Sequence, residues 1–68
     1  MIATAERNVT RDFCLRTARS LEQHADRAQF ATRASSDDFE AVFFSGFAFA
    51  LTAVAESLRH VALEEMAT

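Results

Sequence analysis

Two side chains able to bind a metal ion or move a proton, Glu56 and His60, lie four residues apart in this 68-residue chain. At that spacing on a helix both reach one ligand from the same face, and the only cysteine, Cys14, would join them if the chain folds back on itself. This trio is the candidate for a metal or small-ligand carrier. Four-helix carboxylate sites use Glu-x-x-His spacing with further inward acids, which the sequence lacks, so we expect no metal and no cofactor.

The other candidate nucleophiles and bases favour structural roles over catalysis. Cys14 lies among small residues at helical spacing, whereas a reactive thiolate needs an electropositive and partly exposed site. His24 lies at the edge of the same stripe, where a packed histidine is the usual case. Gly46 is the only glycine, so no glycine-rich phosphate loop exists, and its place among phenylalanines predicts the close approach of a helix or ring. We predict that the protein is not an enzyme.

A row of basic residues is the strongest candidate for partner binding. Spacings of three and four place its members on one helix face: Arg16, Arg19, Gln23, Arg27 and Phe30. Guanidinium groups bind carboxylates in a bidentate manner, and a ring supplies an apolar anchor. We expect an acidic protein surface as partner and no nucleic acid, because the net charge is −3 and no nucleic-acid motif occurs. The alternative is a solvated face whose arginines pair with neighbouring acids.

Two long helices must position these residues, since the chain has no proline and one glycine. Segment 34–40 carries the only internal helix-start signal. Asp37 as N-cap would form a capping box with Glu40, and Ser35 as N-cap would use Asp38 instead. We predict a single domain, 1–68, with helix 1 at about 4–33, a loop at about 34–37 and helix 2 at about 37–66.

The apolar spacing predicts an all-α antiparallel hairpin in which large side chains face small ones. The expected core stripe of helix 2 is Phe43, Phe47, Leu51, Val54, Leu58 and Val61. The facing stripe of helix 1 is Cys14, Ala18, Leu21, Ala25, Ala28 and Thr32. This register brings Asp12 close to Arg59. Before Cys14 the apolar phase changes, which indicates a bend near residues 8–10, a short extra N-terminal helical segment, or first turns that pack on another chain.

Helix 2 has more apolar surface than one neighbour can cover, and this surface predicts self-association. The side chains left outside the hairpin core are Phe39, Val42, Phe44 and Phe49. A contiguous apolar patch on a small domain normally marks an interface. We expect a homodimer or higher oligomer, with hairpins forming a four-helix bundle.

A membrane location is the alternative for helix 2, whose residues 41–55 carry no charge. Fifteen residues span about 22 Å of helix, less than the roughly 30 Å of a bilayer core. Both borders are acidic, Glu40 and Glu56, whereas membrane helices are commonly flanked by basic residues. We therefore do not expect membrane insertion. A single cysteine and an N-terminus without signal-peptide features favour the cytoplasm.

These observations favour a small non-enzymatic protein-interaction module that acts as a helical homo-oligomer. Inhibitors, antitoxins, adaptors and assembly subunits all fit that description. The alternatives are a metal or small-ligand carrier that uses Glu56, His60 and Cys14, and a small membrane-associated helical peptide.

Overall fold

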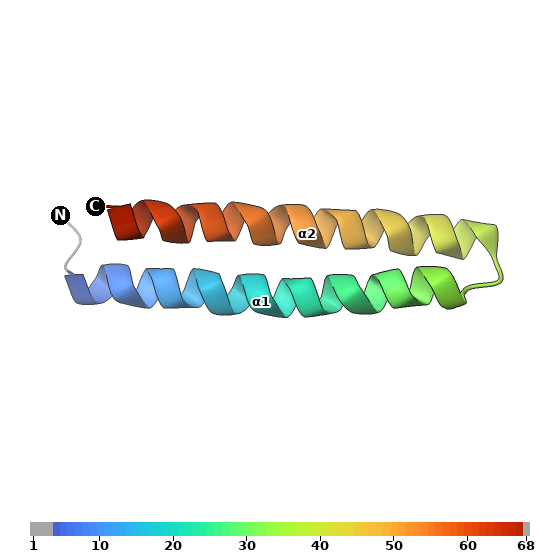
Figure 1. Cartoon of the computed structure of the whole chain (residues 1–68), viewed down its shortest axis with the longest axis horizontal. Coiled ribbons are helices and arrows are strands. Elements are labelled where there is room, and N and C mark those ends of the chain that lie inside the picture. The colour runs from blue at the N-terminus through green and yellow to red at the C-terminus, as the bar shows by residue number, and fades with distance from the viewer. Residues whose placement is uncertain (1–3, 68) are drawn as a thin grey trace.

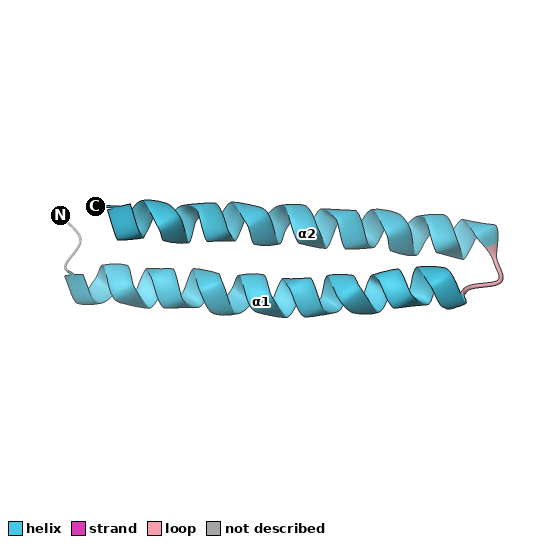
Figure 2. Ribbon diagram, viewed as in Figure 1, coloured by secondary structure: helices cyan, strands magenta, loops and turns pink. Residues whose placement is uncertain are grey.

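The chain folds as an antiparallel hairpin of two straight helices (Figure 1, Figure 2). The computed structural model describes the backbone of residues 4–67 and the side chains of residues 8–65. Helix α1 runs over Thr4–Ala34 and α2 over Asp38–Ala67, so both predicted ranges are confirmed to within one residue. The Cα atoms extend over 52 × 13 × 13 Å, and the start of α1 and the end of α2 lie at the same end of the hairpin.

Asp37 is the N-cap of α2, which decides between the two caps that the sequence allows. Its carbonyl oxygen accepts the first helical bond, from the Ala41 amide at 3.0 Å, and its Oδ1 accepts the Phe39 amide at 2.9 Å. Ser35 supports the turn, since its hydroxyl lies 3.1 Å from Glu40 Oε2 and accepts the Asp37 amide at 3.2 Å. Glu40 therefore bonds the loop hydroxyl instead of closing a capping box.

The start of α1 contains neither the predicted bend nor a separate helical segment. The helix is continuous from Thr4 to Ala34, including residues 8–10. The change in apolar phase instead leaves Val9 and Phe13 exposed on the outside of α1. A continuous helix tolerates this change because nothing in the α1 backbone requires the outer side chains to be polar.

Only small side chains are buried in the seam between the helices. Among the described residues, the buried apolar positions are Cys14, Ala18, Ala25 and Ala28 in α1 and Ala48, Ala55 and Ala62 in α2. The α2 alanines recur every seven residues, as an antiparallel coiled-coil seam requires. Small side chains along that line allow the two backbones to approach closely.

The predicted core stripe of α2 is wrong. Four of its members lie largely outside the seam, with exposed fractions of 59% for Phe43, 47% for Phe47, 50% for Val54 and 41% for Val61, while Leu51 and Leu58 are half-buried. An apolar helix has no single apolar face by which periodicity can orient it. The orientation is decided by the alanine line, because rings in the seam would force the helices apart.

The predicted register is also wrong in detail. Arg59 of α2 bonds to Glu22 of α1 and not to Asp12, whose carboxylate pairs with Arg11 at 3.5 Å. Packed alanines set the observed register. The sequence pattern had placed phenylalanine rings in the seam and therefore did not identify these alanines as the packing layers.

Candidate functional site

The structure separates the three candidate metal ligands. Cys14 is buried in the seam, whereas Glu56 and His60 are exposed and line a shallow depression on the outer side of α2 with Ser57 and Glu64. Within the described part of the chain, no group of three or more His, Cys, Asp or Glu side chains is placed to hold a metal ion. The expected burial of Cys14 is confirmed.

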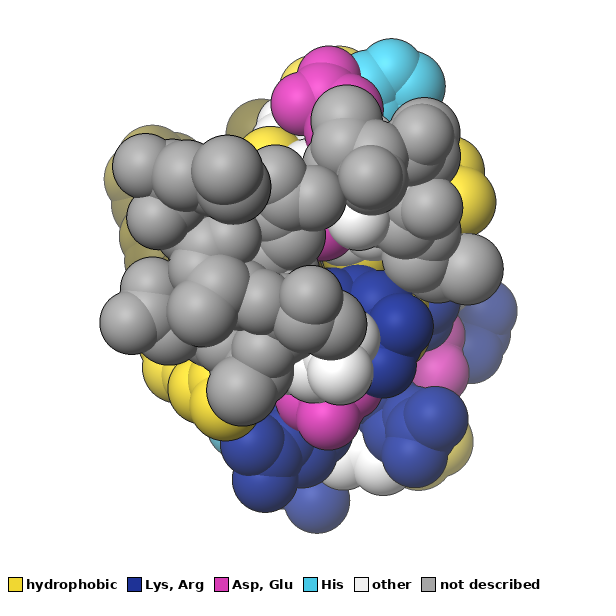
Figure 3. Space-filling model, turned by 90° about the vertical axis from the view of Figure 1, so that its left-hand side faces the viewer, with side chains coloured by type: hydrophobic (Ala, Val, Ile, Leu, Met, Phe, Trp, Pro, Cys, Tyr) yellow, Lys and Arg dark blue, Asp and Glu magenta, His cyan; other side chains and the backbone are white. Residues whose placement is uncertain are grey.

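All five members of the Arg row are exposed on the side of α1 that faces away from α2. Arg16 donates from Nε to the backbone oxygen of Asp12 at 3.4 Å, which leaves its terminal nitrogens for a partner. Of the residues that the structure describes, no acid forms an ion pair with Arg19 or Arg27. Basic side chains gather over the α1 half of the hairpin in the end-on view of Figure 3.

The two sides of the seam differ in chemistry, and one of them is polar. Arg59 Nε donates to Glu22 Oε2 at 3.1 Å, and its Nη2 bonds the other carboxylate oxygen. The hydrogen bond from Arg59 lowers the pKa of Glu22 below its ordinary value of 4.5, against desolvation, and the positive charges of Arg59 and Arg19 lower it further. The same bond raises the pKa of Arg59.

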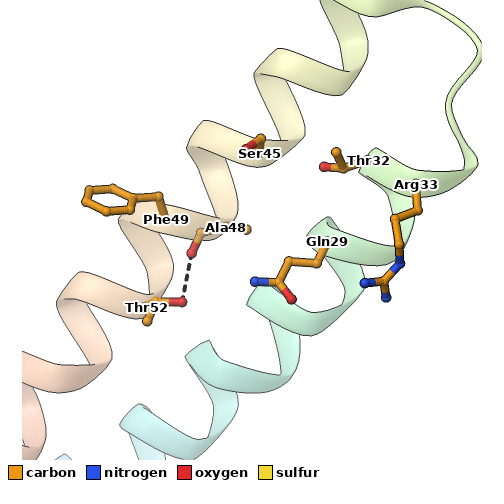
Figure 4. Close-up of a pocket in the computed structure, with 7 residues that line it drawn as sticks. All are labelled: Gln29, Thr32, Arg33, Ser45, Ala48, Phe49 and Thr52. Atoms are coloured by element: carbon orange, nitrogen blue, oxygen red, sulfur yellow. Dashed lines mark hydrogen bonds between the residues drawn. The ribbon is translucent and has the colours of Figure 1, made fainter.

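A shallow groove extends this side toward the loop (Figure 4). Its lining consists of Gln29, Thr32, Arg33, Ser45, Ala48, Phe49 and Thr52. The Thr52 hydroxyl is already satisfied, because it donates to the Ala48 carbonyl at 2.9 Å, and the Phe49 ring points away from α1. We call this side, marked by Glu22, Gln29, Ser45, Thr52 and Arg59, the polar face.

The opposite side of the seam is apolar. Phe47 precedes the buried Ala48 and Phe49 follows it, and successive residues of a helix lie about 100° apart, so the two rings point to opposite sides. We call the Phe47 side the apolar face. Its α2 positions are Phe43, Phe44, Phe47, Ala50, Leu51, Val54, Ser57, Leu58 and Val61, none of which is charged.

Three rings form a continuous cluster on the apolar face near the loop. Phe43 stacks on Phe47 with 6.2 Å between ring centroids and meets Phe44 edge-on at 5.5 Å. Phe44 is half-buried beside the seam, and the other two rings are largely exposed. The cluster is therefore partly covered on its inner side and open on its outer side.

The predicted interface residues divide between several parts of α2. Phe39 and Val42 are exposed near the loop and Phe49 is exposed beside the polar face, but Phe44 lies half-buried in the hairpin itself. The prediction that a helix or ring closely approaches Gly46 is wrong within the hairpin, since a Cβ atom placed there would meet nothing within 4 Å. Gly46 lies on the outer side of α2, away from α1.

Sequence reasoning missed the apolar face because it assigned six of its residues to the core of the hairpin. A signal was present: alanine occurs at positions 41, 48, 55 and 62, and three of these alanines are buried. A seven-residue alanine repeat in an otherwise bulky helix marks the side on which another helix approaches closely.

The segment Asp38–Glu65 is long and apolar enough, by length and composition, to cross a membrane. Only 11% of its most apolar window is buried, so the hairpin does not enclose α2 as the core of a soluble protein encloses a central helix. α1 therefore leaves much of the apolar surface of α2 exposed.

The arrangement thus offers surfaces for association: an apolar face, a polar face and an outer Arg row. Comparison of the chain with protein-family models, with curated proteins and with solved structures finds no match. The geometry of these surfaces is therefore what supports a function.

Proposed function

We propose that the protein is a non-enzymatic interaction module that works as a homo-oligomer, in which two hairpins form a four-helix bundle. The observation that carries this proposal is the seam, where every buried side chain among the described residues is a cysteine or an alanine. A monomeric hairpin would leave its large apolar side chains in water, and a second hairpin would cover them.

The energetics favour association. Burial of one methylene-sized group contributes about 0.8 kcal/mol, whereas burial of a Val, Leu or Phe side chain contributes about 1.5–3 kcal/mol. Seven small buried side chains therefore supply a modest core for a chain of 68 residues. No disulfide supplements it, because the only cysteine is free.

The Arg row is the surface that such a bundle would present to another protein. It lies on α1, on the side away from α2, so it stays exposed when hairpins associate through α2. Its guanidinium groups fit a partner with exposed carboxylates. A cytoplasmic adaptor, inhibitor, antitoxin or assembly subunit would use such a surface.

Membrane association is the second candidate, favoured by the apolar and poorly buried segment Asp38–Glu65. The packing of α1 along α2 argues against it, because α1 carries six arginines and four acids. A charged side chain at the bilayer centre costs about 2.5–3.5 kcal/mol, so the hairpin would have to open before α2 could insert. We therefore rank it below self-association.

Sedimentation equilibrium at micromolar concentration, with and without detergent, tests both candidates. Self-association predicts at least twice the chain mass of 7.6 kDa without detergent. A protein that sediments as a folded, helical monomer at every concentration measured would contradict the proposal. Precipitation that only detergent prevents, with flotation on liposomes, would favour the membrane candidate.

A further inference from the structure

We propose that the apolar face is the surface on which a second copy of this chain docks, and that the polar face and the outer side of α2 stay outside the contact. This inference rests on the proposed self-association and adds the surface that performs it. It replaces the expected contact through Phe39, Val42 and Phe49 with one through Phe43, Phe47, Val54 and Val61.

Charge supports a second copy as the occupant. A two-fold interface brings the same patch of both chains together, so a charged patch would meet its own sign. The α2 positions of the apolar face carry no charge from Phe43 to Val61. On α1, the half-buried Thr17, Leu21 and Ala31 lie on this side, together with the exposed His24, which is seven residues from both Thr17 and Ala31. None of these four residues is an acid, a lysine or an arginine. The apolar face is therefore self-complementary, unlike the Arg row.

The polar face is a poor contact for a second copy. It carries the Glu22–Arg59 ion pair, whose side chains keep about two-fifths of their surface exposed, at 43% and 42%. A second hairpin on this side would desolvate that pair together with Gln29 and Arg33. Desolvation of paired charges is costly, so this side favours water.

The size of the apolar face matches the requirement of a stable dimer. Two helices of about 10 Å diameter, side by side over the 52 Å length of the hairpin, present roughly 1,000 Å². A standard interface buries about 800 Å² on each partner. The stacked Phe43 and Phe47 rings lie toward one end of this area and Val61 toward the other, so apolar anchors are distributed along its length.

A lipid surface is disfavoured as the occupant by the acids that border the face. Glu40 and Glu64 lie at its two ends, and α2 with its cap residue carries six acids against one arginine. Anionic membranes repel such a border, whereas interfacial helices are usually flanked by basic residues. Lipid binding remains a distinct outcome of the test below.

Phe47→Glu and Phe49→Glu form a matched pair of variants. Both residues are exposed in the hairpin, at 47% and 77%, and they lie on opposite sides of Ala48 in the same helix. We expect Phe47→Glu to raise the dimer dissociation constant by about 1,000-fold, since a two-fold dimer contains the change twice. Phe49→Glu should leave it within about threefold of the parent, as expected outside an interface.

Single tryptophans give a second measurement that holds even if Phe47→Glu fails to fold. The chain contains no tryptophan and no tyrosine, so Phe47→Trp and Phe49→Trp each carry one emitting side chain. We expect the Phe47→Trp emission to shift to the blue as concentration rises through the dissociation constant, with no shift for Phe49→Trp. The dilution series uses the full chain without lipid.

The outcomes separate the two proposals. A monomeric parent protein overturns both. If the parent is an oligomer and the Phe49→Glu variant dissociates, the choice of face is overturned and self-association stays intact. This holds whether or not the Phe47→Glu variant also dissociates. A blue shift of Phe47→Trp that requires phosphatidylcholine or phosphatidylglycerol vesicles identifies a lipid surface as the occupant and overturns this inference.

Discussion

The two faces of the hairpin are built from the same two helices and differ in what they can bind. On the polar face, the side chains satisfy one another or water: Glu22 with Arg59, and the Thr52 hydroxyl with its own helix. On the apolar face, Phe47, Val54 and Val61 leave 41–50% of their surface exposed. The difference arises because the residues before and after each seam alanine point to opposite sides of the hairpin.

The largest effect should come from opening the seam from which both faces project. Ala55 has an exposed fraction of 0%, so Ala55→Phe places a ring between the backbones and should lower the stability by more than about 3 kcal/mol, above the usual range for overpacking. Thermal unfolding followed by circular dichroism measures the loss. Ala53→Phe on the exposed outer side of α2 is the control and should keep the hairpin. Equal melting of the two variants would contradict the seam.

Truncation of the two rings should distinguish the faces next. Phe47→Ala should destabilise the assembly by about 2–3 kcal/mol per chain, because docking of a second copy buries the 47% of Phe47 that the hairpin leaves exposed. Phe49→Ala should change the stability by less than about 0.5 kcal/mol, as for other surface positions. Melting temperatures measured over a hundredfold range of concentration report the difference, since only an assembled state depends on concentration. A concentration-independent loss in Phe47→Ala would place that ring inside the monomer.

The sequence predicted the helices and the loop, because their signals are local: the capping residue Asp37, with Ser35 in the turn before it, and the absence of turn residues elsewhere. It also predicted the stripe of small inward-facing residues on α1, because the polar residues on the opposite side of that helix show which side faces inward. It failed for α2 since apolar residues surround its first half, so the choice of inner face depended on how closely two backbones can approach. That choice is a property of the pair of helices and not of either pattern alone.

The outer Arg row should separate binding from folding. Reversal of two exposed arginines, Arg16→Glu with Arg27→Glu, should change the stability by only about 0–1 kcal/mol. Binding of an acidic protein partner should weaken by at least tenfold, because rim and contact charges both change sign. Isothermal titration with a purified partner and circular dichroism measure the two effects. Unchanged affinity would identify the row as a solvated surface, and a lower oligomer mass would assign it to the bundle contact.

Gly46 provides a test of the outer side of α2. Nothing lies within 4 Å of a Cβ placed there, so Gly46→Ala should stabilise the helix by about 0.5–1 kcal/mol through helix propensity. Chemical denaturation at several protein concentrations measures the gain. Ala53→Gly, two turns further along the same outer side of α2, should give a loss of similar size. A destabilised Gly46→Ala protein would show that another helix packs on the outer side, against the proposed choice of the apolar face.

The smallest effect should be the pH dependence of the Glu22–Arg59 pair on the polar face. The pKa of Glu22 is lower in the folded chain than its ordinary value of 4.5, because Arg59 donates a hydrogen bond to the ionised carboxylate. The pair therefore stabilises the fold fully above that value, and this contribution is lost as the pH falls through the lower pKa of the folded state. Glu22→Gln should melt slightly below the parent protein at neutral pH, and the difference should shrink as the solution is acidified below the ordinary value. Arg59→Met should remove the same pH dependence, and the double variant should show no further change, since both single changes break one interaction. A difference that stays constant on acidification would mean that the carboxylate of Glu22 does not bond to Arg59 in solution.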